Sequence, residues 1–481
     1  MALAVTGLFE SSNKYMANRA LILAAGKGTR MRSSLAKVLH PVCGKPMIQW
    51  SINAAKEAGC EVTVVVGHQR DAVIKALGPD CSWVVQDPPQ GTGDALRCAA
   101  SGIPPEGVLL VMPGDAPLVK PETLKALIDG HNGALCSVLT AHITDEEAKT
   151  SGYGRIIRDS KGDVRLIVEA SSACEEQLKA TEVNTGVYAF DARWLFNEVV
   201  PNLKPHPPKN EYYLTDAIEV AAQAGSLNAV VHNDLEEVTG INDKAALAGA
   251  TKTALQRICE RWLMAGVTIE SPESTWIDAT VSLSPETTLE QGVVLKGVTT
   301  IGEGVLVEAN SRIQDSHIGP GVTIGAGSVC TGATIGERAS VGPMARLRPG
   351  TILKAESKVG NFVEVKKSEI GAGAKISHLS YIGDAVVGEN ANIGAGTITC
   401  NYDGFNKHKT EIKKGAFVGS NTALVAPVTV GEGAIVGAGS TITKDVADHA
   451  LAISRAQQTE KLGAATRINE ANRAKKESDL D

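Results

Sequence analysis

The first half of the chain alternates short apolar runs with segments whose apolar residues recur at helical spacing. An apolar run that ends in glycine is typical of a buried parallel strand, and a period near 3.6 predicts an amphipathic helix. The predicted strands are 20–25, 61–66, 83–86 and 108–112, and the predicted helices are 47–58, 71–77 and 94–101. This alternation indicates an α/β doubly wound, Rossmann-like sheet. Ligands of such sheets bind beyond the carboxyl ends of the strands, where the loop after residue 25 and Asp115 are expected.

A different pattern begins near Ile301, where an aliphatic residue returns about every six positions and is often followed by glycine. The positions in phase are Ile318, Ile324, Ile335, Val341, Leu347, Leu353, Val359 and Val365, and then Ile412, Val418, Leu424, Val430, Val436 and Ile442. A six-residue period predicts a β-helix in which each repeat forms one side of a triangular coil. The rhythm breaks between Ile398 and Ile412, where TCNYDGFNKHKTE predicts an extruded loop. A β-helix can also be a purely structural rod, so the period alone does not establish an activity.

The two patterns divide the chain into five expected parts. They are an N-terminal extension (1–18), an α/β domain (19–241), a connecting helix (242–265), a β-helix domain (266–455) and a charged C-terminal tail (456–481).

Composition excludes several classes of protein. The net charge of −7 is spread along the chain, which argues against binding to nucleic acid through a basic field. The nine cysteines are scattered without metal-binding spacing, so reduced thiols in the cytoplasm are expected. No apolar segment approaches the ~18 residues of a membrane-spanning helix, so we expect no membrane partner.

The stretch LAAGKGTRM, residues 23–31, predicts a phosphate-binding loop. It is not a P-loop, because Gly28 separates Lys27 from Thr29, and it lacks the third glycine of a dinucleotide fingerprint. Two glycines after a strand still allow backbone N–H groups to approach phosphate oxygens. Arg30 and Lys37 add positive charge, which suits a nucleotidyl transfer that depends on positioning, charge neutralisation and Mg²⁺. Lys27 could contact phosphate or only face solvent.

The β-helix carries its own candidate chemistry in the run ISHLSYIGDA, residues 376–385. His378 could act as the base for acylation of an amine, because the amine loses a proton as it attacks a thioester. Arg348 and Lys366, with Tyr381 and Asn392, could hold a sugar phosphate through charge-assisted hydrogen bonds. A coil histidine without such neighbours is more often structural.

Thirteen short motifs in order carry a resemblance that spans residue 23 to about residue 455. They are LAAGKGTRM, KVLHPVCGKPM, GTGDA, PGDAPL, YGRI, IVE, VNTG, ARLRPG, NFVEVKK, SHLSYIGDA, GAGTITCNYDG, VGSNTALVAPV and GAGSTIT. The sequence resembles the GlmU family of bifunctional enzymes, which make UDP-N-acetylglucosamine for bacterial peptidoglycan and lipopolysaccharide. The resemblance implies a nucleotidyltransferase domain followed by the left-handed parallel β-helix of hexapeptide acyltransferases, which commonly form trimers with active sites between subunits.

The resemblance also implies substrates and residue roles. Glucosamine-1-phosphate would be acetylated from acetyl-CoA, and UMP from UTP would then be transferred to the product with Mg²⁺, releasing pyrophosphate. His378, Arg30 and Lys37 would be catalytic, and Asp115 and Asn242 would bind the metal. The nucleotide contacts would be Leu23, Ala24, Gly26, Gly28, Lys37, Gln86, Gly91 and Thr92, of which the last three match the uracil-reading segment. Sugar-phosphate contacts would be Gly154, Glu169 and Asn184 in the first domain and Arg348, Lys366, Tyr381 and Asn392 in the second. Acetyl-CoA contacts would be Ala395, Asn401, Tyr402, Ser420, Ala438 and Arg455.

Three positions depart from the family pattern. Ser34 and Ala36 stand where an Asp and a Pro are usual, and Asp94 stands where a His is common. We expect these changes to affect local packing and nucleotide affinity rather than to abolish activity. Two alternatives remain open. The chain could be a nucleotidyltransferase whose β-helix only oligomerises or regulates, in which case it would resemble the ADP-glucose pyrophosphorylases. It could also be an assembly subunit that keeps both folds but has no catalytic activity.

Overall fold

The computed structural model describes residues 18–478 apart from 80, 171 and 208–209. The chain divides into two compact units, one up to Ile258 and one from Cys259 onward. Helix α10 (Lys244–Met264) spans the boundary between the two units and lies within residues 242–265, where a connecting helix was expected. Residues 1–17 of the expected extension lie outside the described residues, and Asn18 already belongs to the first strand.

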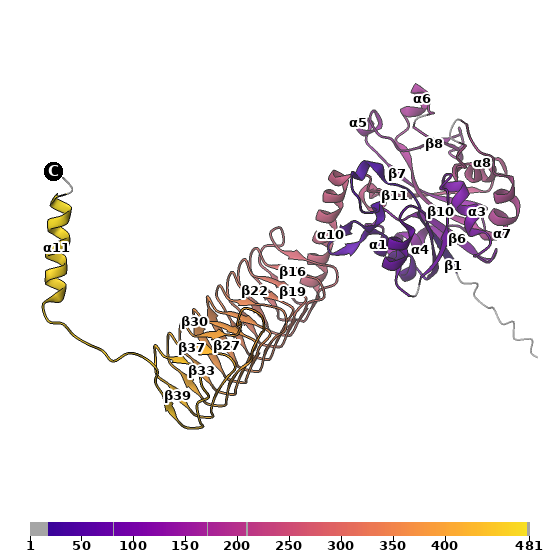
Figure 1. The fold of residues 1–481 in the computed structure, drawn as a ribbon. Helices are drawn as coiled ribbons and strands as arrows, with labels where there is room; N and C mark the ends of the chain where they lie inside the picture. The colour runs from indigo at the N-terminus through magenta and orange to yellow at the C-terminus, as the bar shows by residue number, and fades with distance from the viewer. Residues whose placement is uncertain (1–17, 80, 171, 208–209, 479–481) are drawn as a thin grey trace, which may run out of the picture. The chain divides into compact units, whose positions relative to one another are not determined.

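The first unit is built on a mixed sheet (Figure 1) with the strand order β11-β7-β10-β6-β1-β4-β5. These strands are β1 (Asn18–Ala24), β4 (Cys60–Val66), β5 (Ser82–Val85), β6 (Val108–Pro113), β7 (Cys136–His142), β10 (Glu182–Asp191) and β11 (Leu227–His232). The predicted strands thus exist, and β1, β4, β5 and β6 are parallel. Strand β10 runs antiparallel to β6 and β7, a direction that the apolar pattern did not indicate. It also pairs with β8 (Arg155–Arg158), which forms a hairpin with β9 (Val164–Val168).

Helices cover both faces of this sheet. The longer ones are α1 (Met47–Glu57), α2 (Arg70–Leu77), α3 (Thr92–Ala99), α4 (Pro121–Asp129) and α8 (Thr215–Gln223), and the short ones are α5 (Asp145–Ala148), α6 (Glu175–Leu178), α7 (Ala192–Trp194) and α9 (Leu235–Val238). Alternate residues of β1 point to opposite cores: Ile22 packs with α1, α2 and α4, whereas Leu21 packs with α3 and α8. Burying each side chain stabilises the sheet by roughly 1.5–3 kcal/mol. Because both faces are covered, ligands can reach the strands only at their ends.

The second unit is a parallel β-helix (Figure 1) whose successive coils contribute short strands to three sheets of 11, 10 and 9 strands. It begins with β12 (Thr268–Ile269), earlier than the rhythm noticed from Ile301, and ends with β41 (Leu451–Ala452). Every aliphatic residue of the predicted six-residue phase from Ile318 to Ile442 is buried. Most steps in the register are 17 or 18 residues long, as from Ile318 to Ile335 and from Ile335 to Leu353. The coil that carries the predicted loop is longer, because Val387 pairs with Ile412 across it.

We call the three sheets of the coil faces D, E and F. The strands of face D used below are β24 (Ser340–Val341), β27 (Lys358–Asn361), β30 (Lys375–His378), β33 (Asn392–Ile393), β36 (Phe417–Val418) and β39 (Ile435–Val436). Those of face E are β25 (Arg346–Leu347), β28 (Glu364–Lys366), β31 (Tyr381–Gly383) and β34 (Ile398–Cys400). Face F includes β32 (Ala385–Val387) and β35 (Thr410–Ile412). The tail contains helix α11 (Ala464–Ser478), which was not predicted.

Candidate active sites

The loop after β1 forms one wall of a cavity of about 250 Å³ in the first unit. Its lining residues are Leu23, Ala24, Gly26, Gly28, Thr29, Arg30, Lys37, Val38, Asp115 and Asn242. Eight of these ten were predicted as nucleotide, catalytic or metal residues, and Thr29 and Val38 were not. Lys27 is exposed and does not line the cavity, which favours its solvent-facing alternative.

Gly28 holds the loop against Lys37. Its φ of +58° lies in the left-handed region, and a Cβ added to it would stand 2.5 Å from the Cβ of Lys37. Gly26 differs, because a Cβ there would meet nothing within 4 Å. The first glycine therefore leaves room inside the cavity, whereas the second lets the backbone pass directly over Lys37.

Four polar side chains meet at the floor of the cavity. The ammonium of Lys37 donates to Asn242 Oδ1 at 2.7 Å and forms an ion pair with Asp115. Arg30 donates to the same Asn242 oxygen at 2.8 Å. Asp115 follows β6, and the N–H of Ile241 donates to its carbonyl at 2.9 Å, so the segment that carries Asn242 is fixed beside it.

The site fits Mg²⁺ as a ligand set. One ammonium contacts both Asp115 and Asn242, so a single cation can reach an oxygen of each. Mg²⁺ prefers such oxygen ligands and usually completes its shell with water and substrate phosphates. Within the described residues there is no cluster of three or more His, Cys, Asp or Glu side chains suited to a metal, so this pair is the best-supported candidate.

Gln86, Gly91 and Thr92 lie together where β5 passes into α3. The buried Gln86 amide donates from Nε2 to the carbonyl of Gly91 at 2.8 Å. Gly91 has a φ of +99°, and a Cβ there would collide with the carbonyl oxygen of Tyr212. Thr92 accepts a hydrogen bond from the N–H of Leu214 at 3.0 Å. The three predicted residues are therefore brought together and held by the segment around Tyr212.

The predicted sugar contacts of the first unit converge on the β8–β9 hairpin and β10. The N–H of Asn184 donates to the carbonyl of Gly154 at 2.9 Å, and Glu169 directly follows β9. Burial raises the pKa of the Glu169 carboxyl. Arg155, which sequence reasoning missed, is fully buried and donates to carbonyl oxygens including those of Ala148 and Ser151. It fixes the backbone next to Gly154.

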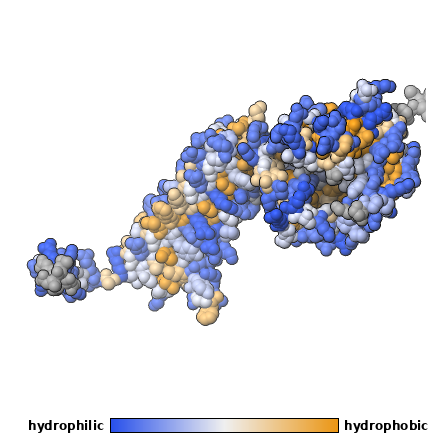
Figure 2. Space-filling view, turned by 90° about the horizontal axis from the view of Figure 1, so that it is seen from above, coloured by the Kyte–Doolittle hydropathy of each residue, from blue (hydrophilic) through white to orange (hydrophobic). Residues whose placement is uncertain are grey.

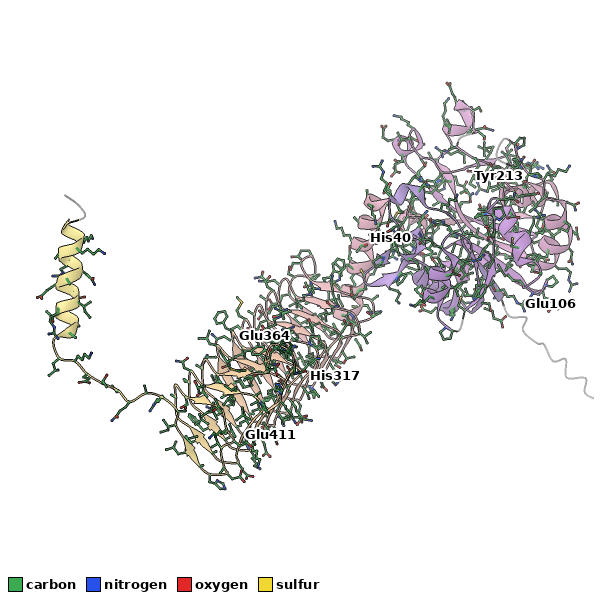
Figure 3. The ribbon with its side chains drawn as sticks, viewed as in Figure 1. His40, Glu106, Tyr213, His317, Glu364 and Glu411 are labelled. Atoms are coloured by element: carbon green, nitrogen blue, oxygen red, sulfur yellow. The ribbon has the colours of Figure 1, made fainter. Side chains whose placement is uncertain are left out.

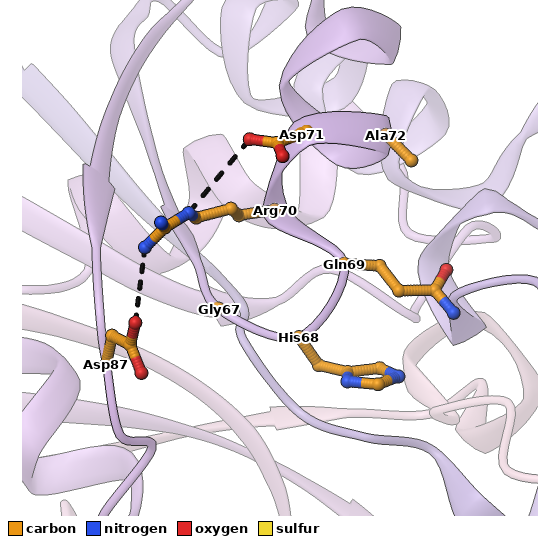
Figure 4. Close-up of a pocket in the computed structure, with 7 residues that line it drawn as sticks. All are labelled: Gly67, His68, Gln69, Arg70, Asp71, Ala72 and Asp87. Carbon is orange, nitrogen blue, oxygen red and sulfur yellow. Dashed lines mark hydrogen bonds and ion pairs between the residues drawn. The ribbon is translucent and has the colours of Figure 1, made fainter.

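A second cavity, of about 530 Å³, opens at the end of β4 (Figure 4). Arg70 lies between Asp71 and Asp87, with 3.2 Å from its Nη1 to Asp87 Oδ2 (Figure 4). His68 borders the cavity, and its backbone N–H donates to the carbonyl of Ala25, the first residue after β1. None of these residues was predicted as a site residue.

On the β-helix, face E carries most of the predicted sugar-phosphate set. Arg348 forms an ion pair of 2.9 Å with Glu364, labelled in Figure 3, and Lys366 follows on the same strand as Glu364. In the register, Lys366 lies opposite Gly383, and a Cβ on Gly383 would collide with the hydroxyl of Tyr381. Arg348, Lys366 and Tyr381 are therefore neighbours on adjacent coils.

Asn401 belongs to the same neighbourhood as Tyr381. Its Nδ2 would stand 2.8 Å from a Cβ on Gly383, and it donates to Asp384 Oδ2 at 2.5 Å. The next residue, Tyr402, is exposed and lies under Lys407, with 4.0 Å between the ammonium and the ring centroid. Asp403 accepts hydrogen bonds from the N–H groups of Asn406 and Phe405 and contacts His408 at 2.7 Å, and these bonds lower the pKa of its carboxyl. The extruded loop is thus internally braced.

His378 lies at the corner between faces D and E. Its Nδ1 stands 2.6 Å from Asn361 Oδ1, one coil earlier. An amide oxygen can only accept, so Nδ1 carries the proton and Nε2 presents a lone pair. Asn361 was not predicted, although its position 17 residues before His378 matches the coil period and could have revealed it.

The predicted acetyl-CoA contacts continue along this corner. Ile376 pairs with Ile393, so the same register places His378 opposite Ala395. The N–H of Asn421 donates to the carbonyl of Ala395, and the N–H of Gly439 to that of Ser420. Arg455 donates to the carbonyl of Ala438 at 2.6 Å. The equivalent position on successive coils is occupied in turn by His378, Ala395, Ser420 and Ala438. Arg455 lies at the end of this line.

Asn392 does not join the other predicted sugar-phosphate residues. It pairs with Lys375 and Phe417 on face D, whereas Arg348, Lys366 and Tyr381 lie on face E. The six-residue period could have predicted this placement. Asn392 directly precedes Ile393, whose inward side chain belongs to the row of aliphatic residues on face D. Within one chain, Asn392 therefore lies apart from the other three predicted sugar-phosphate residues.

The three departures have distinct surroundings. The carbonyl of Ser34 accepts a hydrogen bond from Gln69 Nε2 at 2.7 Å, and Ala36 is buried just before Lys37. Asp94 is buried and accepts a hydrogen bond from Gln86.

The fold and the sites define a transferase with a nucleotidyltransferase unit and a hexapeptide β-helix unit. Residues 20–236 match the model of the MobA-like NTP transferase domain, and residues 298–332 and 409–444 match the bacterial transferase hexapeptide (six repeats). Proteins named bifunctional protein GlmU are similar over nearly their whole length. The protein of Trichlorobacter lovleyi is 46% identical over 451 residues, which are 92% of this chain and 97% of that protein. The Geobacillus sp. protein is 46% identical over 455 residues (94% and 98%), and the Thermotoga maritima protein 45% over 446 (92% and 98%).

The chain therefore belongs to the GlmU family of bifunctional enzymes. It is a uridylyltransferase that uses Mg²⁺ and an N-acetyltransferase whose acetyl donor is acetyl-CoA, and its β-helix is of the left-handed parallel type. None of the helices in the described part of the chain is long and apolar enough to cross a membrane.

Proposed function

We propose that the cavity under the β1 loop performs the uridylyl transfer. Asp115 and Asn242 would hold Mg²⁺, which supplies charge neutralisation on the phosphates when bound. Mg²⁺ would take the place of the Lys37 ammonium beside Asp115 and Asn242. Lys37 and Arg30 would then be free to face the phosphates of UTP, with backbone N–H groups of the glycine loop beside them. The phosphate oxygen of N-acetylglucosamine-1-phosphate attacks the α-phosphorus, and the bond to pyrophosphate breaks. Gly154, Glu169 and Asn184 would hold the sugar. The observation that carries this assignment is the single cation position shared by Asp115 and Asn242.

Asp115→Ala tests this assignment. We expect pyrophosphate release to fall by orders of magnitude while acetyl transfer, measured as free thiol, stays at the wild-type rate. Pyrophosphate release that remains dependent on Mg²⁺ at the wild-type rate in this variant would refute the metal site.

We propose that the acetyl transfer takes place at the corner of the β-helix that carries His378. Nε2 of His378 takes the proton from the amine of glucosamine-1-phosphate as nitrogen attacks the thioester carbonyl, and the carbon–sulfur bond breaks to release coenzyme A. Arg348, Lys366 and Tyr381 would hold the sugar phosphate. The line from Ala395 through Ser420 and Ala438 to Arg455 supports a cofactor arm lying along the corner, since backbone groups and small side chains leave room for it.

We infer that the acetyltransferase site is completed in a homotrimer. Asn392 lies on face D, away from the other sugar-phosphate residues, so a neighbouring copy could supply it. Apolar side chains reach the surface at several places along the coil (Figure 2). Met344, Phe362 and Leu379 stack at the D–E corner on successive coils, exposed by 56%, 60% and 63%, and Leu379 is adjacent to His378. An exposed apolar stripe of this kind is typical of an interface.

Sedimentation of Phe362→Glu tests the trimer. We expect a shift from trimer to monomer, together with loss of acetyl transfer and retention of uridylyl transfer. Val298→Glu is the matched control, because Val298 is 74% exposed on the same β-helix but lies between a strand of face E and a strand of face F, outside this stripe. A trimer of unchanged stability in Phe362→Glu would contradict the proposed interface.

We propose that the protein acts in the cytoplasm, where it would supply UDP-N-acetylglucosamine for cell-wall polymers. No disulfide joins the cysteines within the described residues, in keeping with a reducing compartment.

A further inference from the structure

Asp94 is the departure from the family pattern with the most direct link to the nucleotide site. Its Oδ2 accepts a hydrogen bond from Gln86 Nε2 at 2.9 Å, and both side chains are buried. The same Nε2 donates to the carbonyl of Gly91 at 2.8 Å. Asp94 also contacts Arg97 at 3.5 Å, and the Arg97 guanidinium lies 4.6 Å from the ring centroid of Tyr212.

These contacts fix which way the Gln86 amide points. An amide NH₂ has two hydrogens, and here both meet oxygen acceptors: the backbone carbonyl of Gly91 and the carboxylate of Asp94, which pairs with Arg97. The reversed amide would set its oxygen against those two oxygens. Within the described residues, Gln86 Oε1 has no hydrogen-bond partner, so it is the atom left to meet a ligand.

We propose that Asp94 is a positioning residue that makes Gln86 an obligatory acceptor and thereby selects uracil over cytosine. The N3 position of uracil carries a hydrogen and donates, whereas N3 of cytosine is an acceptor and would face Gln86 Oε1 without a proton between them. An unpaired acceptor facing another acceptor in a buried site carries the full desolvation penalty. This inference rests on the proposed placement of the base beside Gln86, and it goes further by assigning the selectivity to the buried carboxylate behind it.

Asp94→Asn is the sharpest variant, because it keeps the shape but replaces an acceptor-only group with an amide that can also donate. The Gln86 amide can then reverse with only the Gly91 carbonyl opposing it. We expect the ratio of kcat/KM for UTP over CTP to fall about tenfold, the effect of one neutral hydrogen bond. The change should lie in KM for UTP rather than in kcat, because the base is remote from the phosphates.

A merely structural role for Asp94 makes a different prediction. Loss of a charge from the first turn of α3 would lower activity with UTP and CTP in the same proportion. Asp71→Asn is the matched control, since Asp71 lies in the first turn of α2, is exposed and does not contact Gln86. Acetyl transfer by the same polypeptide reports that each variant is folded.

Gln86→Met separates this inference from the proposed function beneath it. If Gln86→Met leaves the UTP/CTP ratio unchanged, the base does not lie at Gln86 and the proposed nucleotide site is misplaced. If Gln86→Met lowers the ratio but Asp94→Asn does not, the base site stands and the role of Asp94 is overturned. A lowered ratio in both variants supports the inference.

Discussion

Substitution of the two loop glycines by alanine should have opposite signatures. Gly28 has a φ of +58°, and its added Cβ would stand 2.5 Å from Lys37 Cβ. The left-handed conformation costs alanine about 1–2 kcal/mol, and forcing the loop off Lys37 adds a cost of the kind seen on overpacking, about 1–3 kcal/mol. We therefore expect Gly28→Ala to destabilise the first unit by about 2–5 kcal/mol and to displace Lys37 from Asp115.

Gly26→Ala is the matched control. Its Cβ would meet nothing within 4 Å, and its φ is not in the left-handed region, so stability should change by less than about 0.5 kcal/mol. The new methyl group lies at the wall of the nucleotide cavity, so KM for UTP should rise instead.

Thermal unfolding followed through the first unit and steady-state pyrophosphate release distinguish the two variants. A loss of about 2–5 kcal/mol in a unit of this size corresponds to a decrease in Tm of about 4–20 °C for Gly28→Ala. Acetyl transfer should be unchanged in both variants. Equal Tm values and equal kinetics for the two variants would refute the assignment of Gly28 as the residue that seats the loop on Lys37.

Three further predictions follow from the polar contacts. Lys37→Met should raise the affinity of the nucleotide-free enzyme for Mn²⁺ about tenfold or more, because it frees two oxygen ligands. Electron paramagnetic resonance measures this affinity, and Lys27→Met, at an exposed position, should leave it unchanged. A lower affinity in Lys37→Met would contradict the shared cation position. Asn361→Leu should lower kcat of acetyl transfer at least about tenfold and alter its pH profile, because His378 loses the partner that sets its tautomer. Uridylyl transfer should be unchanged. An unchanged pH profile of acetyl transfer would show that Asn361 has no part in the mechanism. Burial raises the pKa of Glu237, but hydrogen bonds from Thr123 and Lys120 outweigh it, so the folded-state pKa is lowered. That stabilisation is present above the ordinary pKa of about 4.3 and is lost as pH falls through the folded value. Glu237→Gln should therefore cost about 1–3 kcal/mol in urea unfolding at pH 7 and progressively less in acid, whereas a pH-independent difference would contradict the charge-based account.

The periodic parts of the fold could be predicted from the sequence because one physical requirement repeats along the chain. Each aliphatic residue of the β-helix fills the same interior, so six-residue spacing identified the buried positions from Ile318 to Ile442. The same phase also assigns faces, and applied to Asn392 it would have separated this residue from Lys366. The antiparallel strand β10 carries no such signal, because the direction of a buried strand depends on its connections rather than on its apolar pattern.

The candidate nucleotide site was predictable as a set because strand ends bring Gly28, Lys37 and Asp115 to one edge. Residues that act through another side chain were not predictable. Arg155 and Asp94 are ordinary charged residues in the sequence, and only the structure shows that one binds carbonyl groups in the core and the other accepts a hydrogen bond from Gln86.

The division of labour between the two units is tested most directly with His378→Ala, with coenzyme A thiol and pyrophosphate followed separately. With glucosamine-1-phosphate, acetyl-CoA, UTP and Mg²⁺, we predict neither product from this variant. Replacing the amino sugar by N-acetylglucosamine-1-phosphate should restore pyrophosphate release to the wild-type rate. Pyrophosphate release that stays absent with the acetylated sugar, or thiol release that persists with the amino sugar, would contradict the account.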